Sequence, residues 1–247
     1  MKLNKHYNEI SIIIPAYNEE KRIEPTIIKI LKYIKPKFNK FELLIIDDGS
    51  KDKTIDIISK YQKENNEIKI LKNIKNKGKG YSVKKGILDS KYDLVLFSDS
   101  DLATPIEELE KLKKQIDKGF DIAIASRNLN TSNIVVKQPL YRQILGNLFP
   151  YFVQIIAVSG IKDTQCGFKM YKNNVAKEIA KRQTLERFSF DVEQLFIAKK
   201  MKYKIAEVGV TWIDKEGSKV STIKDGLRML RDLFIIRLNH SKGIYKK

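Results

Sequence analysis

The feature that most constrains the fold of this chain is the alternation of short apolar runs with longer amphipathic segments through its first half. Apolar runs of this length predict buried strands, and apolar residues recurring every three or four positions predict helices. Strands that alternate with helices call for right-handed crossovers and a mostly parallel sheet flanked by helices. The predicted strands are Ile10–Ile14, Glu42–Ile46, Ile68–Leu71, Leu94–Ser98, Ile122–Ala125 and Ile205–Val210.

Helical patterns fill the segments between these strands and much of the second half. One start signal is Pro105, which suits a first helical position and is followed by the acidic Glu107 and Glu108. The predicted helices are Lys21–Ile34, Thr54–Asn65, Tyr81–Asp89, Pro105–Lys118, Pro139–Val158, Val175–Lys181, Asp191–Lys200 and Thr222–Leu238. The alternation of strands and helices stops near Asn128–Gln138, where a polar loop begins.

Composition narrows the class of protein. The 247 residues are 42% hydrophobic, enough for a folded core, and their net charge of +18 suggests an anionic partner. Nucleic acid, an anionic membrane surface and phosphorylated substrates all fit that charge, as do lysines that only keep the protein soluble. The single Cys166 excludes an internal disulfide, and two histidines are too few for a histidine metal site. We expect no signal peptide and no membrane span, hence a soluble protein or one resting on a membrane surface.

Acidic or polar loops follow three of the predicted strands. Asp99-Ser100-Asp101 comes after Leu94–Ser98, Asp47-Asp48-Gly49-Ser50 comes after Glu42–Ile46, and Pro15-Ala16-Tyr17-Asn18-Glu19 comes after Ile10–Ile14. Ligands of open α/β sheets bind at the carboxyl ends of the strands, where these loops would meet. Two carboxylates suit Mg²⁺ or Mn²⁺ held together with substrate phosphates. An Asp-x-Asp pair alone is weak evidence, since aspartates also cap loops.

The motifs disfavour several classes of nucleotide-binding protein. The first strand–helix junction lacks the G-x-G-x-x-G of dinucleotide-binding proteins, and Gly78-Lys79-Gly80 lacks the spacing and the Lys-Ser/Thr end of a P-loop. A basic nucleic-acid-binding module is also disfavoured, because aromatic residues do not interleave with a basic stripe. We therefore expect no nucleic acid partner.

Taken together, the motifs resemble those of family 2 glycosyltransferases with a GT-A fold. The matching segments, in chain order, are Ser11–Glu19, Asp47–Ser50, Asn76–Gly80 and Asp99–Asp101. In the second half, Asp163–Lys169, Glu186–Glu193 and Trp212 with Glu216–Val220 resemble the dolichyl-phosphate β-glucosyltransferases of that family. The resemblance implies transfer of glucose from UDP-glucose to a polyprenyl (dolichyl) phosphate, with inversion at the anomeric carbon.

The resemblance also implies a domain organisation. It implies one GT-A domain over residues 1–220, with a nucleotide-binding half (1–127) and an acceptor half (128–220). A basic amphipathic helix and tail would follow over residues 221–247.

Donor-site roles follow from the resemblance. Asp99 and Asp101, with Ser100 between them, would hold Mg²⁺ or Mn²⁺ against the donor diphosphate. Asp47 and Asp48 would contact the nucleoside, although one of the pair could instead cap the helix from Thr54. The first loop would shape the nucleoside pocket through Pro15, Ala16, Tyr17, Asn18 and Glu19. Asn18 and Glu19 could instead cap the next helix, and Lys79 would approach the nucleobase edge or remain a solvated loop lysine.

The acceptor side is expected to be cationic. A phosphate monoester is largely ionised near neutral pH, so it needs cations that hold it rather than a base that deprotonates it. Arg127 is the first candidate, followed by Arg142 and Lys219, with a surface salt bridge as the alternative for each. Asp163 and Asp191 would orient the sugar hydroxyls or these cations, although Asp191 could be a helix N-cap.

Two apolar stripes at helical spacing are either core or a membrane contact. One runs through Leu140, Ile144, Leu145, Leu148, Phe149, Phe152 and Ile156, and the other through Ile223, Leu227, Leu230, Phe234 and Leu238. With a lipid acceptor and a basic chain, we expect a peripheral protein of a cytoplasmic membrane face that binds an anionic surface.

Other functions remain open from the sequence. The chain has Ala103 where many dolichyl-phosphate mannosyltransferases have Gln, which favours the glucosyl branch. The alternatives within the fold are a GDP-mannose-dependent mannosyltransferase and a family 2 transferase with a non-lipid acceptor. A non-catalytic sugar-nucleotide-binding homologue is disfavoured by the intact Asp99 and Asp101.

Overall fold

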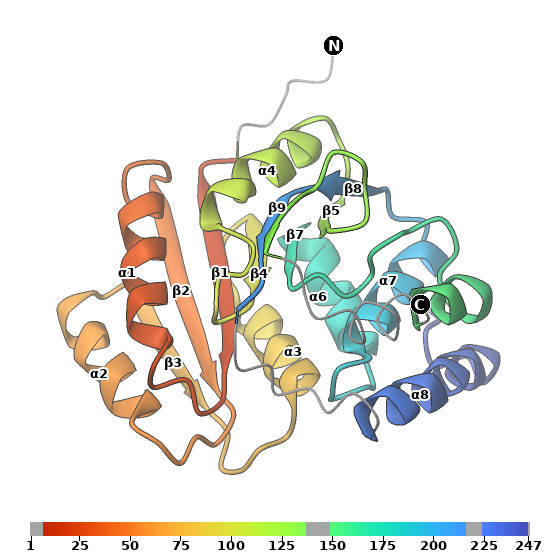
Figure 1. Ribbon diagram of the computed structural model, residues 1–247, viewed down its shortest axis with the longest axis horizontal. Coiled ribbons are helices and arrows are strands. Elements are labelled where there is room, and N and C mark those ends of the chain that lie inside the picture. The colour runs from red at the N-terminus through yellow and green to blue at the C-terminus, as the bar shows by residue number, and fades with distance from the viewer. Residues whose placement is uncertain (1–6, 137–148, 216–223, 247) are drawn as a thin grey trace.

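Seven strands form a single central sheet in a computed structural model that describes residues 7–136, 149–215 and 224–246 (Figure 1). Their order across the sheet is β3-β2-β1-β4-β7-β5-β8. All six predicted strands are confirmed within a few residues. The strands are β1 (Glu9–Ala16), β2 (Lys40–Asp47), β3 (Ile68–Lys72), β4 (Leu94–Ser98), β5 (Ile122–Ser126), β7 (Phe168–Lys172) and β8 (Ile205–Gly209).

Strand β7 is the one member of this sheet that the sequence pattern did not predict. It lies antiparallel between β4 and β5, with Lys169 opposite Phe97 on one side and opposite Ile124 on the other. All other strand pairs of the sheet are parallel. A lysine inside a short apolar run normally indicates an exposed segment, and that is why the run was not recognised as a central strand. The expected mostly parallel sheet is therefore confirmed with one antiparallel insertion.

A second, two-stranded sheet pairs β6 (Asn133–Val136) with β9 (Thr211–Ile213) in parallel. The amide of Ile213 also donates a hydrogen bond to the carbonyl oxygen of Ala103, at 2.8 Å. The small sheet thus ties the chain after β5 and β8 to the loop that follows β4.

Helices cover both faces of the central sheet (Figure 1). Apolar residues of α1, α2 and α4 join one buried cluster, and those of α3, α6, α7 and α8 join the other. Helical residues 149–156 are described from a longer predicted helix, Pro139–Val158, whose first part lies outside the described residues. The helices are α1 (Ile23–Ile34), α2 (Thr54–Glu64), α3 (Lys79–Asp89), η1 (Ile106–Glu108), α4 (Leu109–Asp117), α6 (Asn173–Arg182), α7 (Phe190–Lys200) and α8 (Lys224–Ser241).

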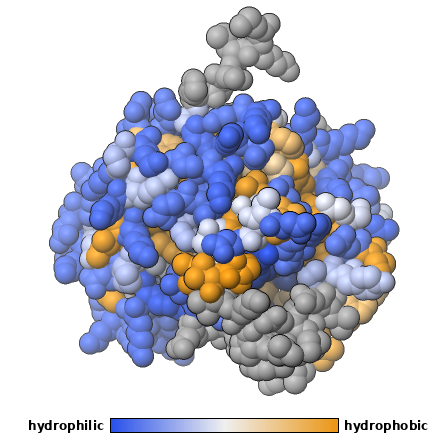
Figure 2. Space-filling model, turned by 45° about the horizontal axis from the view of Figure 1, so that its top comes forward, coloured by the Kyte–Doolittle hydropathy of each residue, from blue (hydrophilic) through white to orange (hydrophobic). Residues whose placement is uncertain are grey.

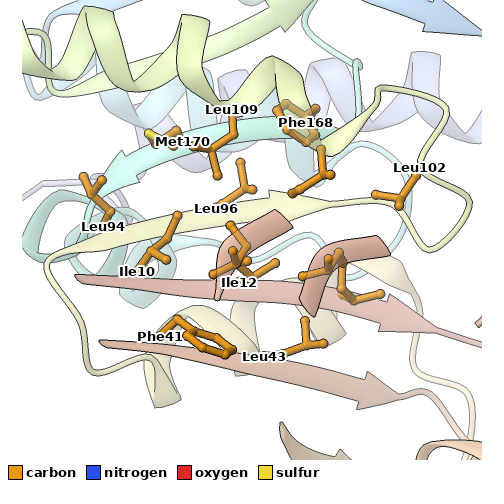
Figure 3. Close-up of a cluster of buried hydrophobic side chains, with 14 of the residues drawn as sticks. Ile10, Ile12, Phe41, Leu43, Leu94, Leu96, Leu102, Leu109, Phe168 and Met170 are labelled. Carbon is orange, nitrogen blue, oxygen red and sulfur yellow. The ribbon is translucent and has the colours of Figure 1, made fainter. Parts of the chain in front are cut away.

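Burial on both faces explains why the parallel strands read as continuous apolar runs. Ile10 and Ile12 point into the first cluster and Ile13 into the second, because successive strand side chains alternate between faces. Figure 3 shows the first cluster, which includes Leu96 and Phe168 of the neighbouring strands β4 and β7 together with Leu109 of α4. This double-sided core fixes the register of the sheet and so the positions of the loops at its carboxyl edge.

The chain's excess of basic residues lies at the surface. Hydrophilic residues cover most of the face drawn in Figure 2, with hydrophobic residues gathered in a few patches. Among the described lysines and arginines, Lys169 is the only buried one. Within residues 7–136, 149–215 and 224–246, no helix combines the length and apolar character needed to cross a bilayer.

Candidate active site

The loop after β4 is fixed in place by hydrogen bonds to two other segments of the chain. The Asp99 amide donates to the Gly167 carbonyl at 3.0 Å, and Thr26 Oγ1 of α1 donates to the Ser100 carbonyl at 2.6 Å. Leu102 adopts a φ of 48°, which turns the chain sharply after the second aspartate and buries its own side chain. The two carboxylates of Asp99 and Asp101 are therefore held on a rigid turn at the carboxyl edge of the sheet.

Gly167 is required by the position of Asp99. A Cβ at residue 167 would lie 2.1 Å from Asp99 Oδ2, closer than any two unbonded heavy atoms can approach. The residue just before β7 must therefore be glycine for the Asp99 carboxylate to keep its place. Antiparallel insertion of β7 beside β4 is what brings this glycine to the Asp-x-Asp loop.

The Asp99 carboxylate forms an ion pair with Lys79. Its Oδ1 lies 2.6 Å from Nζ of Lys79, an ion pair whose two side chains are about one-third and one-quarter exposed. The contact lacks the angles of a hydrogen bond, and Oδ1 is a buried polar atom with no hydrogen-bond partner. Such an atom is costly unless a further ligand satisfies it.

Asp101 stands beside Asp99 in a partly buried position. Its Oδ1 accepts a hydrogen bond from the Ala103 amide at 3.0 Å. Burial raises the pKa of Asp101 above the usual aspartate value, and the neighbouring Asp99 carboxylate raises it further. A cation between the two carboxylates would relieve this repulsion.

Below the loop lies a buried ion pair between Lys169 of β7 and Asp191 in the first turn of α7. Both side chains are almost completely buried, and Lys169 Nζ also donates to the Cys166 carbonyl at 2.7 Å. Burial raises the pKa of Asp191 despite the opposing charges of Lys169 and Lys79. Asp191 therefore pairs with Lys169 and is not the helix N-cap, a position that belongs to Ser189.

Lys79 opens helix α3 and faces the acidic groups. Burial lowers the pKa of its ammonium, but Asp99, Asp191 and Asp101 outweigh burial and raise it above the usual lysine value. That Lys79 approaches a nucleobase edge stays a prediction, whereas the alternative of a solvated loop lysine does not hold, because Lys79 begins α3 and its side chain is about one-quarter exposed. Its ammonium lies at the Asp-x-Asp loop.

The aspartates after β2 organise two loops. Asp47 accepts hydrogen bonds from the Gly49 and Ser50 amides, while Asp48 accepts them from the Lys77 and Gly78 amides at 2.9 and 2.8 Å. The alternative cap for the helix from Thr54 is wrong for both residues. The N-cap position of α2 is Lys53, and Asp52 just before it accepts a hydrogen bond from the Thr54 amide.

The first loop is tied to the loop after β2. The Asn18 amide donates to Ser50 Oγ, its side-chain oxygen accepts from the Lys51 amide, and the Glu19 amide donates to Thr54 Oγ1. Glu19 itself is buried and its carboxylate accepts from Arg22 Nε at 2.7 Å. Pro15, Ala16 and Tyr17 continue from β1 into this loop, so the three predicted donor loops do meet at one edge of the sheet.

Arg127 and Asp163 form a bidentate ion pair on the other side of the Asp-x-Asp loop. Nε and Nη2 of Arg127 lie 2.7 and 2.9 Å from the two oxygens of Asp163, whose side chain is buried. Burial raises the pKa of Asp163, but the Arg127 guanidinium outweighs it and holds this pKa below its usual range. The Arg127 side chain is about one-third exposed, and its guanidinium packs over the ring of Trp212, 5.6 Å from its centre.

The structure brings most of the predicted site residues to one edge, but not all of them can be placed. Arg142 and Lys219 lie outside the described residues. Asp163 takes the second of its two expected roles, since it orients Arg127. Cys166 is no nucleophile candidate, because burial raises the pKa of its thiol to about 11. Gly167 and Lys169 were missed as site residues, although both lie in the Asp163–Lys169 segment.

The two carboxylates of the Asp-x-Asp loop suit a divalent cation shared with a ligand. Asp99 Oδ1 has the Lys79 ammonium beside it but no hydrogen bond, and burial together with the Asp99 carboxylate raises the pKa of Asp101. Among the residues that the structure describes, no three His, Cys, Asp or Glu side chains group into a site that would enclose a metal alone. Hard cations bound by one or two carboxylates take their remaining ligands from water and phosphates.

Comparison with known proteins identifies relatives of the whole chain. The family model for glycosyl transferase family 2 matches residues 11–180. A dolichyl-phosphate β-glucosyltransferase of Dictyostelium discoideum is 38% identical over 96% of this chain and 76% of its own length. The proteins of the same name from Homo sapiens and Saccharomyces cerevisiae are 34% and 33% identical, over 96% and 99% of this chain and 78% and 80% of their own.

Solved structures confirm the GT-A fold that the motifs predicted. The glucosyl-3-phosphoglycerate synthase of Mycobacterium tuberculosis, in complex with Mn²⁺, UDP-glucose and phosphoglyceric acid, superposes with a TM-score of 0.66. It is 15% identical, over 94% of this chain and 79% of that one. TarS of S. aureus in complex with UDP-GlcNAc gives a TM-score of 0.59 at 20% identity, over 94% of this chain and 67% of that one.

Proposed function

We propose that this chain moves glucose from UDP-glucose to a polyprenyl phosphate such as dolichyl phosphate. The chain belongs to family 2 of the glycosyl transferases and to its dolichyl-phosphate β-glucosyltransferase branch. The observation that carries the proposal is the relatives' identity over nearly the whole chain, combined with an intact Asp-x-Asp loop in a fixed turn. The anomeric carbon inverts, because one phosphate oxygen attacks it as UDP leaves from the opposite face.

Donor binding is assigned to the three loops at the carboxyl edge. The nucleoside lies between the loop from Pro15 to Glu19 and the loop from Asp47 to Ser50, whose backbones are tied together. Asp99 and Asp101 hold Mg²⁺ or Mn²⁺ against the diphosphate. When bound, the cation supplies Lewis-acid stabilisation of the charge that develops on the leaving UDP.

Acceptor binding is assigned to Arg127 and the groups that position it. A phosphate monoester has its second pKa near about 6, so at neutral pH its attacking oxygen carries charge without a general base. Asp163 and Trp212 fix the guanidinium in one orientation, and Asp163 takes the N–H of Nε and one N–H of Nη2, so other N–H groups remain to donate to a phosphate oxygen. Arg142 and Lys219 remain further candidates outside the described residues.

We predict that UDP binds more tightly than GDP in the presence of Mn²⁺. The reason is the similarity to dolichyl-phosphate β-glucosyltransferases over nearly the whole chain. Isothermal calorimetry with the two nucleotides measures the preference directly, and the same titrations in EDTA serve as the control for metal dependence. Tighter binding of GDP would move the assignment to a mannosyltransferase that uses GDP-mannose.

Of the second predicted apolar stripe, Leu227, Phe234 and Leu238 are exposed and Leu230 is partly buried, and the fully buried side chains of α8 come from other positions. Leu233 and Ile236 of α8 are buried, whereas Leu227, Phe234 and Leu238 are 68%, 59% and 51% exposed. The exposed three recur every seven and four residues and so share one face of the helix. Figure 1 shows α8 at the end of the molecule toward which β1 and β2 point, where the donor loops also lie. A lipid acceptor would reach the site from that end.

We predict that this face of α8 binds the surface of an anionic, cytoplasmic membrane leaflet. Exposed Arg231 and Arg237 flank the apolar side chains, and each basic residue near such a surface contributes about 1 kcal/mol. In co-sedimentation with phosphatidylserine vesicles at low salt, the double variant Phe234→Asp, Leu238→Asp should lose binding. Salt should weaken binding of the unmodified chain, because a Debye length is about 10 Å at 0.1 M.

The matched control for that experiment is Ile28→Asp, which charges an exposed apolar residue of α1 that belongs to no such stripe. It should bind vesicles as the unmodified chain does. Removing α8 altogether is not a clean test, because Leu233 and Ile236 belong to the core. If the unmodified chain ignores anionic vesicles at low salt, the membrane assignment fails.

A further inference from the structure

Lys79 holds the carboxylate oxygen that a divalent cation would need. Its ammonium lies 2.6 Å from Asp99 Oδ1, the buried oxygen that has no hydrogen bond. A cation coordinated by Asp99 and Asp101 would stand close to this ammonium. Two cations at one carboxylate repel each other strongly where water is largely excluded.

The backbone on either side of Lys79 places its side chain beside Asp99. Gly78, just before it, has a φ of 108°, and a Cβ at that residue would lie 2.5 Å from the Glu186 carbonyl oxygen. A Cβ at Gly80, just after it, would lie 2.6 Å from Phe190 Cβ. Both glycines therefore let the start of α3 pack against the segment before α7, which aims Lys79 at Asp99.

A second lysine, Lys169, lies close to Lys79 but is already paired with another carboxylate. Lys79 and Lys169 place their ammonium groups 5.4 and 5.8 Å from the centre of the Phe97 ring. Lys169 is committed to Asp191 in a buried pair, so it has no freedom to leave. Lys79 is one-quarter exposed and can move when another cation arrives.

We propose that Lys79 competes with the divalent cation for Asp99, and that the donor diphosphate reverses this competition by drawing the ammonium to itself. The inference rests on the proposed function, since it requires a metal at the Asp-x-Asp loop. In the free protein, Lys79 keeps metal affinity low. With nucleotide present, the ammonium donates to diphosphate oxygens, Asp99 is released, and metal and nucleotide bind together.

The diphosphate is a fitting partner for the released lysine. An ammonium carries three N–H donors, and phosphate oxygens accept charge-assisted hydrogen bonds. Lys79 is also the first residue of helix α3, and the positive end of the helix dipole favours an anion there. Metal binding and nucleotide binding are then coupled, and each raises the affinity for the other by the same factor.

The test is to measure the Mn²⁺ affinity of the full chain by electron paramagnetic resonance, with and without UDP. Lys79→Met keeps the length of the side chain and removes its charge. We expect this variant to bind Mn²⁺ without nucleotide about tenfold more tightly than the unmodified chain, because the competing charge is gone. The gain in Mn²⁺ affinity on adding UDP should shrink in the variant.

Lys77→Met is the matched control. Lys77 lies two residues away, and its ammonium contacts the Tyr81 hydroxyl at 3.3 Å and the Tyr81 ring instead of Asp99. It should leave Mn²⁺ affinity unchanged. Circular dichroism and thermal unfolding confirm that each variant is folded.

The outcomes separate the inference from the proposed function. If the unmodified chain binds Mn²⁺ with UDP but Lys79→Met binds free Mn²⁺ no more tightly, the competition is refuted and the metal site stands. If Lys79→Met binds free Mn²⁺ more weakly, the lysine supports the metal and the inference is reversed. If no variant binds Mn²⁺ even with UDP, the metal role of the Asp-x-Asp loop fails as well.

Discussion

Replacing Asp101 with alanine is expected to lower kcat/KM for glucosyl transfer at least about a thousandfold, because a cation held at the leaving diphosphate supplies several kcal/mol of transition-state stabilisation. The fold should survive, since the partly exposed Asp101 carboxylate accepts one short-range hydrogen bond, from the Ala103 amide. The measurement is the rate of transfer of labelled glucose, with thermal unfolding of the same sample.

Two controls sharpen this prediction. Asp101→Asn keeps the shape of the side chain and removes its charge, and it should lose activity to a similar extent. Asp89→Ala removes an exposed carboxylate from the end of α3 and should leave the rate unchanged. Full activity of Asp101→Ala, or of the unmodified chain in EDTA, would refute the metal role of this loop.

Replacing Asp191 with alanine is expected to destabilise the fold by about 3–5 kcal/mol, because it leaves the ammonium of Lys169 buried without its counter-ion. Lys169 is fully buried in β7, and the Cys166 carbonyl is its remaining partner. Urea unfolding followed by circular dichroism measures the loss in the free energy of unfolding. A variant as stable as the unmodified chain would show that the buried Lys169 ammonium does not need Asp191 as its counter-ion.

The double variant Lys169→Met, Asp191→Leu separates stability from activity. Replacing both members of a buried ion pair by apolar residues of similar volume is often neutral for stability, so most of the lost stability should return. Transfer should stay impaired, because Asp191 also faces the ammonium of Lys79, which pairs with Asp99. Restored transfer would assign the pair a purely structural role.

The parts of the fold that follow from local pattern were predictable from the sequence. The parallel strands are buried on both faces, so their apolar runs are continuous and their positions are clear. Strand β7 was not predictable in this way, because its second residue is a buried lysine whose charge is neutralised by Asp191, a residue 22 positions further along the chain. The pairing of β6 with β9 likewise depends on contacts between distant segments.

The residues of the candidate site were likewise predictable only where a local sequence pattern indicates them. Asp99 and Asp101 were evident because two carboxylates follow a buried strand, and Arg127 was a candidate because it follows the predicted strand Ile122–Ala125 and a phosphate acceptor needs a cation. The requirement for glycine at residue 167 arises only once β7 lies beside β4. The meeting of Lys79 with Asp99 depends on how α3 packs against the segment before α7, which no local pattern encodes.

The most direct test of the proposed activity is transfer of radiolabelled glucose from UDP-glucose to dolichyl phosphate, measured by organic extraction of the labelled lipid. With Mn²⁺ present, the unmodified chain should move label into the organic phase, and omission of dolichyl phosphate or replacement of Asp101 by alanine should abolish it. GDP-mannose should give no extracted label. Label extracted from GDP-mannose but not from UDP-glucose, or no lipid product from either donor, would contradict the proposed activity.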